Sequence, residues 1–96
     1  MKVLWTENAI DHLVNIYEYI ACNSPPYGRQ MIDRITRRTV QIAEHALSGR
    51  KVPEYDAEDI RELIEKPYRI IYRIKPNQID IIAVIHGARI ISKDVI

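Results

Sequence analysis

The segment from Gln78 to His86 constrains the fold most, because nearly all of its residues are apolar. In a strand, successive side chains point to opposite faces. The apolar residues here occupy both alternations: Ile79, Ile81, Ala83 and Ile85 on one, and Ile82 and Val84 on the other. This pattern is typical of a central strand with both faces covered. Any fold of this chain must therefore cover two faces of a sheet.

Further strands are predicted on either side of this segment. Tyr68–Ile74 alternates tyrosine and isoleucine with Arg69, Ile71 and Arg73, and Lys75-Pro76-Asn77 forms a turn before Gln78. Ile60–Ile64 is a shorter strand. Residues 60–86 are therefore predicted to form an antiparallel meander. Residues 2–5 are expected to form a first strand, and residues 89–91 a last short one.

The region between the first strand and the meander has helical periodicity. Thr6 caps a predicted helix that runs to about Ala21, with an apolar stripe at Ala9, Leu13, Ile16 and Ile20. Ser24 and Pro25 begin a second helix, and Gly49 is expected to end it in the left-handed conformation. The aperiodic segment from Arg50 to Asp59 is predicted to be a loop.

These elements predict a single α+β domain over residues 1–96 with the order β-α-α-β-β-β. The helical hairpin covers one face of an antiparallel sheet, and the chain offers no further element to cover the other. We therefore expect an exposed apolar sheet face that binds a helix or strand of another polypeptide.

Composition excludes several classes of function. The formal net charge is +1 and the pI is about 7.9, which argues against a purely electrostatic nucleic-acid binder. Cys22 is the only cysteine, and it has no metal-ligand spacing with His12 or His45. Three glycines cannot build a phosphate-binding loop. We expect a soluble cytoplasmic protein without signal peptide, membrane span, metal or cofactor.

Several motifs follow one another in a characteristic order. They are Trp5-Thr6-x-x-Ala9, Leu13-x-x-Ile16-x-x-Tyr19-Ile20, Ser24-Pro25, Gly49-Arg50-x-Val52-Pro53-Glu54, Arg61-Glu62-Leu63, Tyr68-Arg69-Ile70-Ile71-Tyr72-Arg73-Ile74 and Ile82-x-Val84-Ile85-His86-Gly87-Ala88-Arg89. In sequence, spacing and element order the chain resembles the RelE/ParE toxin superfamily, whose members include plasmid stabilisation proteins. The resemblance extends over nearly the whole chain.

The resemblance implies the β-α-α-β-β-β fold and a cognate antitoxin that wraps and neutralises the toxin. It also implies one of two activities. RelE-like members cut messenger RNA on the ribosome, whereas ParE-like members inhibit DNA gyrase and have no known nuclease chemistry.

The residues available for chemistry or partner binding are mainly basic. Metal-independent RNA cleavage needs a base, an acid and positive charge beside the phosphorane. The resemblance implies that Arg69 and His86 match cleavage residues of some nucleases, and Arg61 is a third nuclease candidate. The wider set of target- or partner-binding candidates is Arg61, Arg69, Arg73, His86 and Arg89. A structural role in ion pairs with Glu62, Glu65 or the acidic loop is the alternative for Arg61 and Arg69.

Two departures weaken the nuclease interpretation. Gly87-Ala88 follow His86, where the nucleases often carry an aromatic residue that stacks on the base, and a lysine-rich surface is missing. The leading hypothesis is therefore a ParE-like, non-enzymatic gyrase inhibitor with a cognate antitoxin. The alternatives are a ribosome-dependent mRNA endoribonuclease and an inactive member retained as an antitoxin-binding protein.

Overall fold

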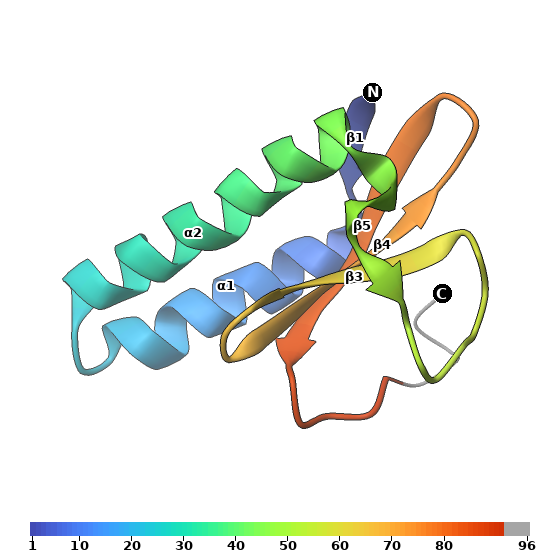
Figure 1. Ribbon diagram of the computed structural model, residues 1–96. Helices are drawn as coiled ribbons and strands as arrows, with labels where there is room; N and C mark the ends of the chain where they lie inside the picture. The colour runs from blue at the N-terminus through green and yellow to red at the C-terminus, as the bar shows by residue number, and fades with distance from the viewer. Residues whose placement is uncertain (92–96) are drawn as a thin grey trace.

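The chain folds into a five-stranded sheet with a helical hairpin on one face, as seen in a computed structural model that describes residues 1–91 (Figure 1). The elements are β1 (Lys2–Trp5), α1 (Glu7–Ala21), α2 (Pro25–Glu44), the 3₁₀ turn η1 (Ala46–Ser48), β2 (Arg50–Lys51), β3 (Ile60–Glu65), β4 (Tyr68–Ile74) and β5 (Gln78–His86). The predicted α+β class and the hairpin packed on the sheet are confirmed. Residues 92–96 of the predicted domain lie outside the described residues.

The strand order is β1-β5-β4-β3-β2, so β5 lies inside the sheet between β1 and β4, and β4 is the middle strand. Strands β3, β4 and β5 form the expected antiparallel meander. Strand β1 pairs with β5 in parallel, from Lys2 opposite Gln78 to Trp5 opposite Ile81, so the sheet is mixed rather than wholly antiparallel. A tight turn fixes the direction of neighbours in the meander, whereas β1 reaches the sheet through two helices and no local pattern encodes its direction.

Both helices begin where the sequence predicts. Thr6 Oγ1 accepts a hydrogen bond from the Ala9 N–H at 3.2 Å, and Ser24 Oγ accepts one from the Tyr27 N–H at 3.4 Å. Helix α2 ends at Glu44, and η1 follows it. Gly49 has φ −80°, so the predicted left-handed ending is wrong. A steric reason favours glycine here, because an added Cβ would lie 2.5 Å from Tyr72 Oη.

The first core cluster lies between the sheet and the two helices. Its fully buried members include Ala9 from α1, Ile35 and Ile42 from α2, and Ile70 and Tyr72 from β4. Each is 0% exposed. The cluster confirms the predicted apolar stripes, because the same side chains that recur at helical spacing contact the sheet.

The second sheet face is covered by the chain itself, so the predicted open apolar face is wrong. Val52 and Tyr55 from the segment after β2 pack against it, together with Ile91. The strand residues of this second cluster are Ile60, Ile71, Ile82, Ala83 and Ile85. The segment can cover the face because it folds back on itself: the N–H groups of Tyr55 and Asp56 both donate to the Val52 carbonyl.

The segment after β5 also differs from its prediction, since residues 89–91 form no strand. The Arg89 N–H donates to the His86 carbonyl at 3.0 Å, which turns the chain away from the sheet edge. The Ile91 N–H then donates to Glu54 Oε2 at 3.3 Å. The Ile91 N–H is thus bonded to the Glu54 carboxylate and not to a neighbouring strand. The apolar residues 90 and 91 had favoured a strand in the sequence.

Candidate functional site

Arg69 is the most tightly held of the predicted site residues. It lies on the sheet face opposite the helices and is 5% exposed. Its Nε donates to Glu62 Oε1 at 2.7 Å, and Nη2 lies 2.7 Å from the same oxygen. Its Nη1 donates to Glu54 Oε2 and to the Arg89 carbonyl, both at 2.9 Å, and Nη2 donates to Glu54 Oε1 at 2.9 Å. All three guanidinium nitrogens are therefore occupied.

The two carboxylates around Arg69 join several parts of the chain. The Glu62 side chain is 0% exposed and also accepts from Arg50 Nε at 2.6 Å. The Arg69 hydrogen bonds hold the pKa of Glu54 down, from 4.5 to about 2. We call Arg50, Glu54, Glu62 and Arg69 the Arg69 cluster. It links β2, β3, β4, the covering segment and the chain after β5.

Arg61 and Arg73 are also engaged in contacts within the chain. Arg61 Nη1 donates to the Gly49 carbonyl at 3.2 Å, and Nη2 lies 3.1 Å from Glu58 Oε2. Arg73 Nε lies 3.8 Å from Asp59 Oδ2, a looser and more exposed ion pair. These contacts agree with the ion-pair alternative: Arg69 pairs with Glu62 and with Glu54 of the acidic loop, and Arg61 pairs with Glu58 of the same loop.

His86 lies on the opposite sheet face from Arg69. It pairs with Tyr68, whereas Arg69 pairs with Ile85. The His86 and Tyr68 rings are in edge contact, with centroids 6.1 Å apart. Arg61 shares the face of His86, but it lies opposite Tyr72, about 13 Å along β4 from Tyr68. The three nuclease candidates Arg61, Arg69 and His86 are therefore not brought together.

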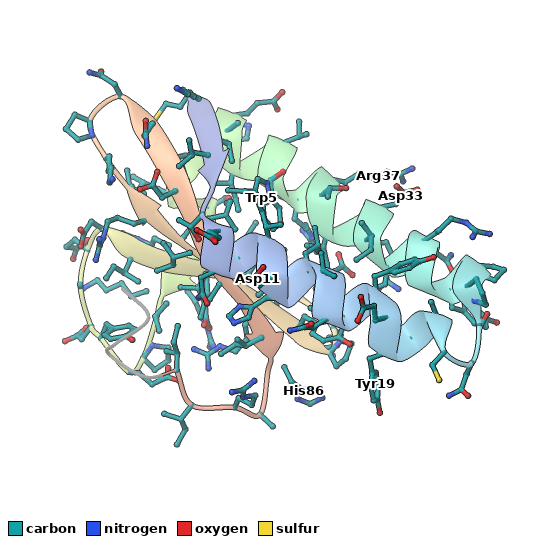
Figure 2. The ribbon with its side chains drawn as sticks, turned by 180° about the vertical axis from the view of Figure 1, so that it is seen from behind. Trp5, Asp11, Tyr19, Asp33, Arg37 and His86 are labelled. Carbon is teal, nitrogen blue, oxygen red and sulfur yellow. The ribbon has the colours of Figure 1, made fainter. Side chains whose placement is uncertain are left out.

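The structure instead brings His86 and Arg89 together with residues of α1. They line a cleft of about 360 Å³ at the end of β5. Its other lining residues are His12, Asn15, Ile16, Tyr19, Tyr68, Val84 and Ile85. Figure 2 shows His86 and Tyr19 on the same side of the molecule. We call this the β5 cleft.

His12 connects α1 to β5 at this cleft. Its Nδ1 accepts a hydrogen bond from the Val84 N–H at 3.1 Å. Burial lowers the pKa of His12, the positive charge of Arg89 lowers it further, and Asp11 opposes the shift. His12 is therefore kept neutral, in the form that accepts the Val84 bond.

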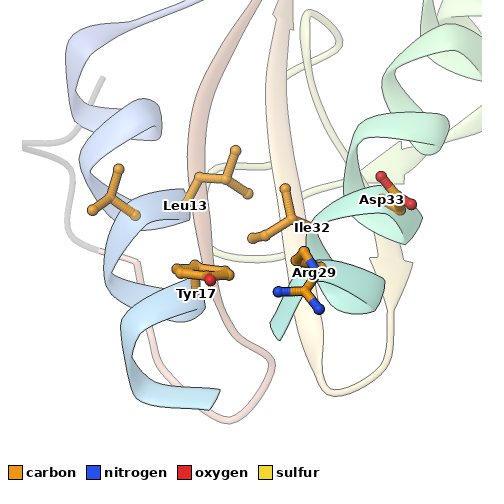
Figure 3. Close-up of a pocket in the computed structure, with 6 residues that line it drawn as sticks. Leu13, Tyr17, Arg29, Ile32 and Asp33 are labelled. Carbon is orange, nitrogen blue, oxygen red and sulfur yellow. The ribbon is translucent and has the colours of Figure 1, made fainter. Parts of the chain in front are cut away.

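A second, larger hollow lies between the two helices. It has a volume of about 570 Å³, and its apolar walls come from Leu13, Val14 and Tyr17 of α1 and Ile32 of α2 (Figure 3). The charged side chains of Arg29 and Asp33 stand at its α2 edge. We call this the helix groove.

The comparisons with known proteins decide the family. The family model described as the ParE toxin of type II toxin–antitoxin systems, parDE, matches residues 3–91. The chain belongs to the ParE toxin family. The resemblance to RelE/ParE toxins is thereby confirmed, and the chain is a toxin component of a toxin–antitoxin system.

Solved structures have the same fold. A chain of the chromosomal ParDE system from P. aeruginosa is 24% identical and superposes with a TM-score of 0.74, covering 90% of this chain and 95% of that one. YoeB from Staphylococcus aureus is 18% identical with a TM-score of 0.63, covering 90% and 95%. The YoeB/ParE toxin from Agrobacterium tumefaciens is 17% identical with a TM-score of 0.63, covering 90% and 98%. The search of curated proteins gave no significant match.

Two further properties of this ParE-family chain concern residues 1–91. Within that range, no helix has the length and apolar character needed to cross a membrane. No group of three or more His, Cys, Asp or Glu residues in the same range is placed to hold a metal ion.

Sequence reasoning did not give His12 a role at a site, and it considered Glu54 as a possible base rather than as the partner of Arg69. A signal for His12 exists, because it stands three residues after Ala9 and four before Ile16, both buried, and so shares their helix face. The pairing of Glu54 with Arg69 spans 15 residues and starts in an aperiodic segment, so no local pattern indicates it.

Proposed function

We propose that this ParE-family toxin arrests growth by protein–protein contact with DNA gyrase and cleaves no RNA. The observation that carries the proposal is the state of Arg69. A nuclease needs free donors beside the phosphorane, whereas Arg69 is 5% exposed and gives every guanidinium nitrogen to acceptors of its own chain. The description of the P. aeruginosa neighbour as a ParDE system also supports this branch of the superfamily.

The placement of His86 supports the same conclusion. A base and an acid must flank one scissile phosphate, but His86 and Arg69 lie on opposite faces of the sheet. Gly87 and Ala88 provide no ring to stack on a base. The YoeB neighbours make a ribosome-dependent endoribonuclease the second candidate.

Gyrase supercoiling and macromolecular synthesis test the proposal. On induction in bacteria without an antitoxin, DNA synthesis should stop before protein synthesis, and the purified toxin should inhibit negative supercoiling by purified gyrase. Because His86 takes part in no chemistry under this proposal, His86→Gln should inhibit gyrase within about twofold of the unmodified toxin. An early stop of translation with normal supercoiling would support the nuclease instead, and normal growth an inactive member.

The helix groove is the surface on which we propose that the antitoxin binds, in the cytoplasm where gyrase also acts. Val14 is 48% exposed and Ile10 47%, although both are large apolar residues on α1. Ile10, Val14 and Tyr17 recur at spacings of four and three, so they form a stripe along the helix. An amphipathic helix can cover such a stripe. Arg29 and Arg37 on α2 favour a partner helix with acidic flanks.

Val14→Glu should weaken the complex with the protein encoded in the adjacent reading frame by about tenfold or more, because it places a charge in an apolar interface. The melting temperature of the isolated toxin should stay within about 2 °C, since Val14 is exposed. Leu47→Glu is the matched control: Leu47 is 69% exposed and lies on η1, away from the groove. Equal loss of affinity in both variants, measured by calorimetry, would place the antitoxin elsewhere.

A further inference from the structure

The β5 cleft is lined by hydrogen-bond donors that have no partner among residues 1–91. His12 Nδ1 accepts from the Val84 N–H at 3.1 Å, and His86 Nδ1 accepts from the Ala88 N–H at 3.2 Å. A neutral imidazole that accepts at Nδ1 carries its proton at Nε2. Each ring therefore presents an Nε2–H donor in the cleft.

Arg89 adds a cation to these donors. Its main chain is fixed, because the carbonyl accepts from Arg69 Nη1 at 2.9 Å and the N–H donates to the His86 carbonyl at 3.0 Å. Its guanidinium has no carboxylate within ion-pair distance among residues 1–91. The lowered pKa of His12, caused by burial and then by Arg89, shows that the positive field of the guanidinium reaches that imidazole. None of the described residues that line the cleft is acidic.

The cleft also adjoins an open strand edge. Strand β1 covers β5 only from Gln78 to Ile81. Beyond that point, α1 side chains replace a strand: Asn8 Nδ2 donates to the Ile82 carbonyl at 3.1 Å, and His12 accepts from Val84. The Gly87 N–H donates to Pro67 on the β4 side, so by alternation the His86 N–H points to the open edge. The His86 N–H can therefore bond a carbonyl of an extended segment, whereas the Val84 N–H is already bonded to His12.

We propose that the β5 cleft binds a side-chain carboxylate of an extended acidic segment of the antitoxin, with Arg89 and the two imidazoles as its donors. The inference rests on the proposed pairing with an antitoxin. The apolar floor formed by Ile16 and Ile85 suits a neighbouring aliphatic side chain of the same peptide.

A peptide fits this cleft better than a nucleic acid does. Binding of RNA or DNA depends on successive phosphate contacts. The sheet arginines that could continue such a track, Arg61, Arg69 and Arg73, are each paired with a carboxylate of this chain. The net charge of the whole chain is only +1. One anion can therefore be held at the cleft, but no row of them.

The test titrates the purified full chain with three probes and follows amide and imidazole NMR signals. The probes are a capped pentapeptide that alternates leucine with acidic residues, its glutamine and asparagine counterpart, and hexauridylate. We expect the acidic peptide to shift the signals of His12, Val84 and His86. Its Kd should rise about tenfold or more in Arg89→Gln and with the amide peptide, because a charge-assisted hydrogen bond is lost. Lys2→Gln is the matched control and should leave Kd unchanged, because it also removes an exposed cation but lies opposite Gln78, at the far end of β5.

Three results would overturn the proposal: no binding of the acidic peptide, equal affinity for the acidic and amide peptides, or shifts confined to residues outside the cleft. Tighter binding of hexauridylate at the cleft would also overturn it and identify a nucleic-acid site. These outcomes are separate from the gyrase assay. An Arg89→Gln toxin that still inhibits supercoiling but no longer binds the peptide supports both proposals. An unmodified toxin that binds the peptide at the cleft but does not inhibit gyrase contradicts only the target assignment.

Discussion

Replacement of Arg69 by methionine is expected to lower the free energy of unfolding by about 3–5 kcal/mol, as removal of one partner of a buried ion pair does. The Glu62 side chain is 0% exposed, and it would keep only Arg50 as a charged partner. Glu54 would lose both of its guanidinium contacts, so the segment that covers the second core cluster would be released. The total free energy of unfolding of a domain of this size is about 5–15 kcal/mol. Urea unfolding followed by circular dichroism measures the loss.

Arg73→Met is the matched control, because it removes an arginine from the same strand face. Arg73 is a third exposed and lies 3.8 Å from its carboxylate, so the expected cost is within about 1 kcal/mol. A folded Arg69→Met protein of unchanged stability that had lost its toxicity would contradict the structural role and restore Arg69 as a candidate for target contact or catalysis.

The acid limb of the unfolding curve offers an independent readout of the Arg69 cluster. The pKa of Glu54 is lowered from 4.5 to about 2 by Arg69, so between these values the unfolded chain binds more protons than the folded one. Stability from this group is thus fully present above pH 4.5 and is lost as the pH falls towards 2. Arg69→Met should lose this component of the pH dependence, whereas Arg73→Met should keep it.

The elements that sequence predicted well are those whose pattern is local. Alternation fixed which residues of β4 face the helices, and the caps at Thr6 and Ser24 fixed where the helices begin. The order of the family motifs then indicated how these elements are arranged in the fold. The direction of β1 and the cover of the second sheet face were not predictable in this way, because both depend on contacts between segments that are distant in sequence.

The site was predicted less well for the same reason. Arg69, His86 and Arg89 were among the residues singled out as candidates, but their position in the chain does not indicate which acidic residues lie beside them. Arg69 found two carboxylates and Arg89 found none within residues 1–91. His12 reaches Val84 across 72 positions. The tertiary fold therefore decides whether an arginine stabilises the structure through ion pairs or is available to bind a partner. These two roles could not be distinguished from the sequence.

Gly49→Ala is expected to lower the free energy of unfolding by about 2–5 kcal/mol, although alanine tolerates the local φ of −80°. An added Cβ would lie 2.5 Å from Tyr72 Oη and 2.6 Å from the Glu62 carbonyl oxygen. The carbonyl belongs to β3, which pairs with β2 at this point, so it cannot move without disturbing the sheet. The Tyr72 hydroxyl is equally fixed: it donates to the Ala46 carbonyl at 2.6 Å and accepts from the Gly49 N–H at 3.0 Å.

Gly28→Ala serves as the control, measured by thermal and urea unfolding. Its added Cβ would meet Ala21 and Tyr17 side chains at 3.2 Å, and the gain in helix propensity of up to about 1 kcal/mol offsets that contact. We expect a net change within about 1 kcal/mol there. Tyr72→Phe should reduce the additional cost of Gly49→Ala, because the closest clash disappears. Equal stabilities for the two alanine variants would contradict the steric role of Gly49.

Gly49→Ala should also weaken the Arg69 cluster, because Arg50 is the next residue and pairs with Glu62. The effects of Gly49→Ala and Arg69→Met on the free energy of unfolding should therefore be less than additive.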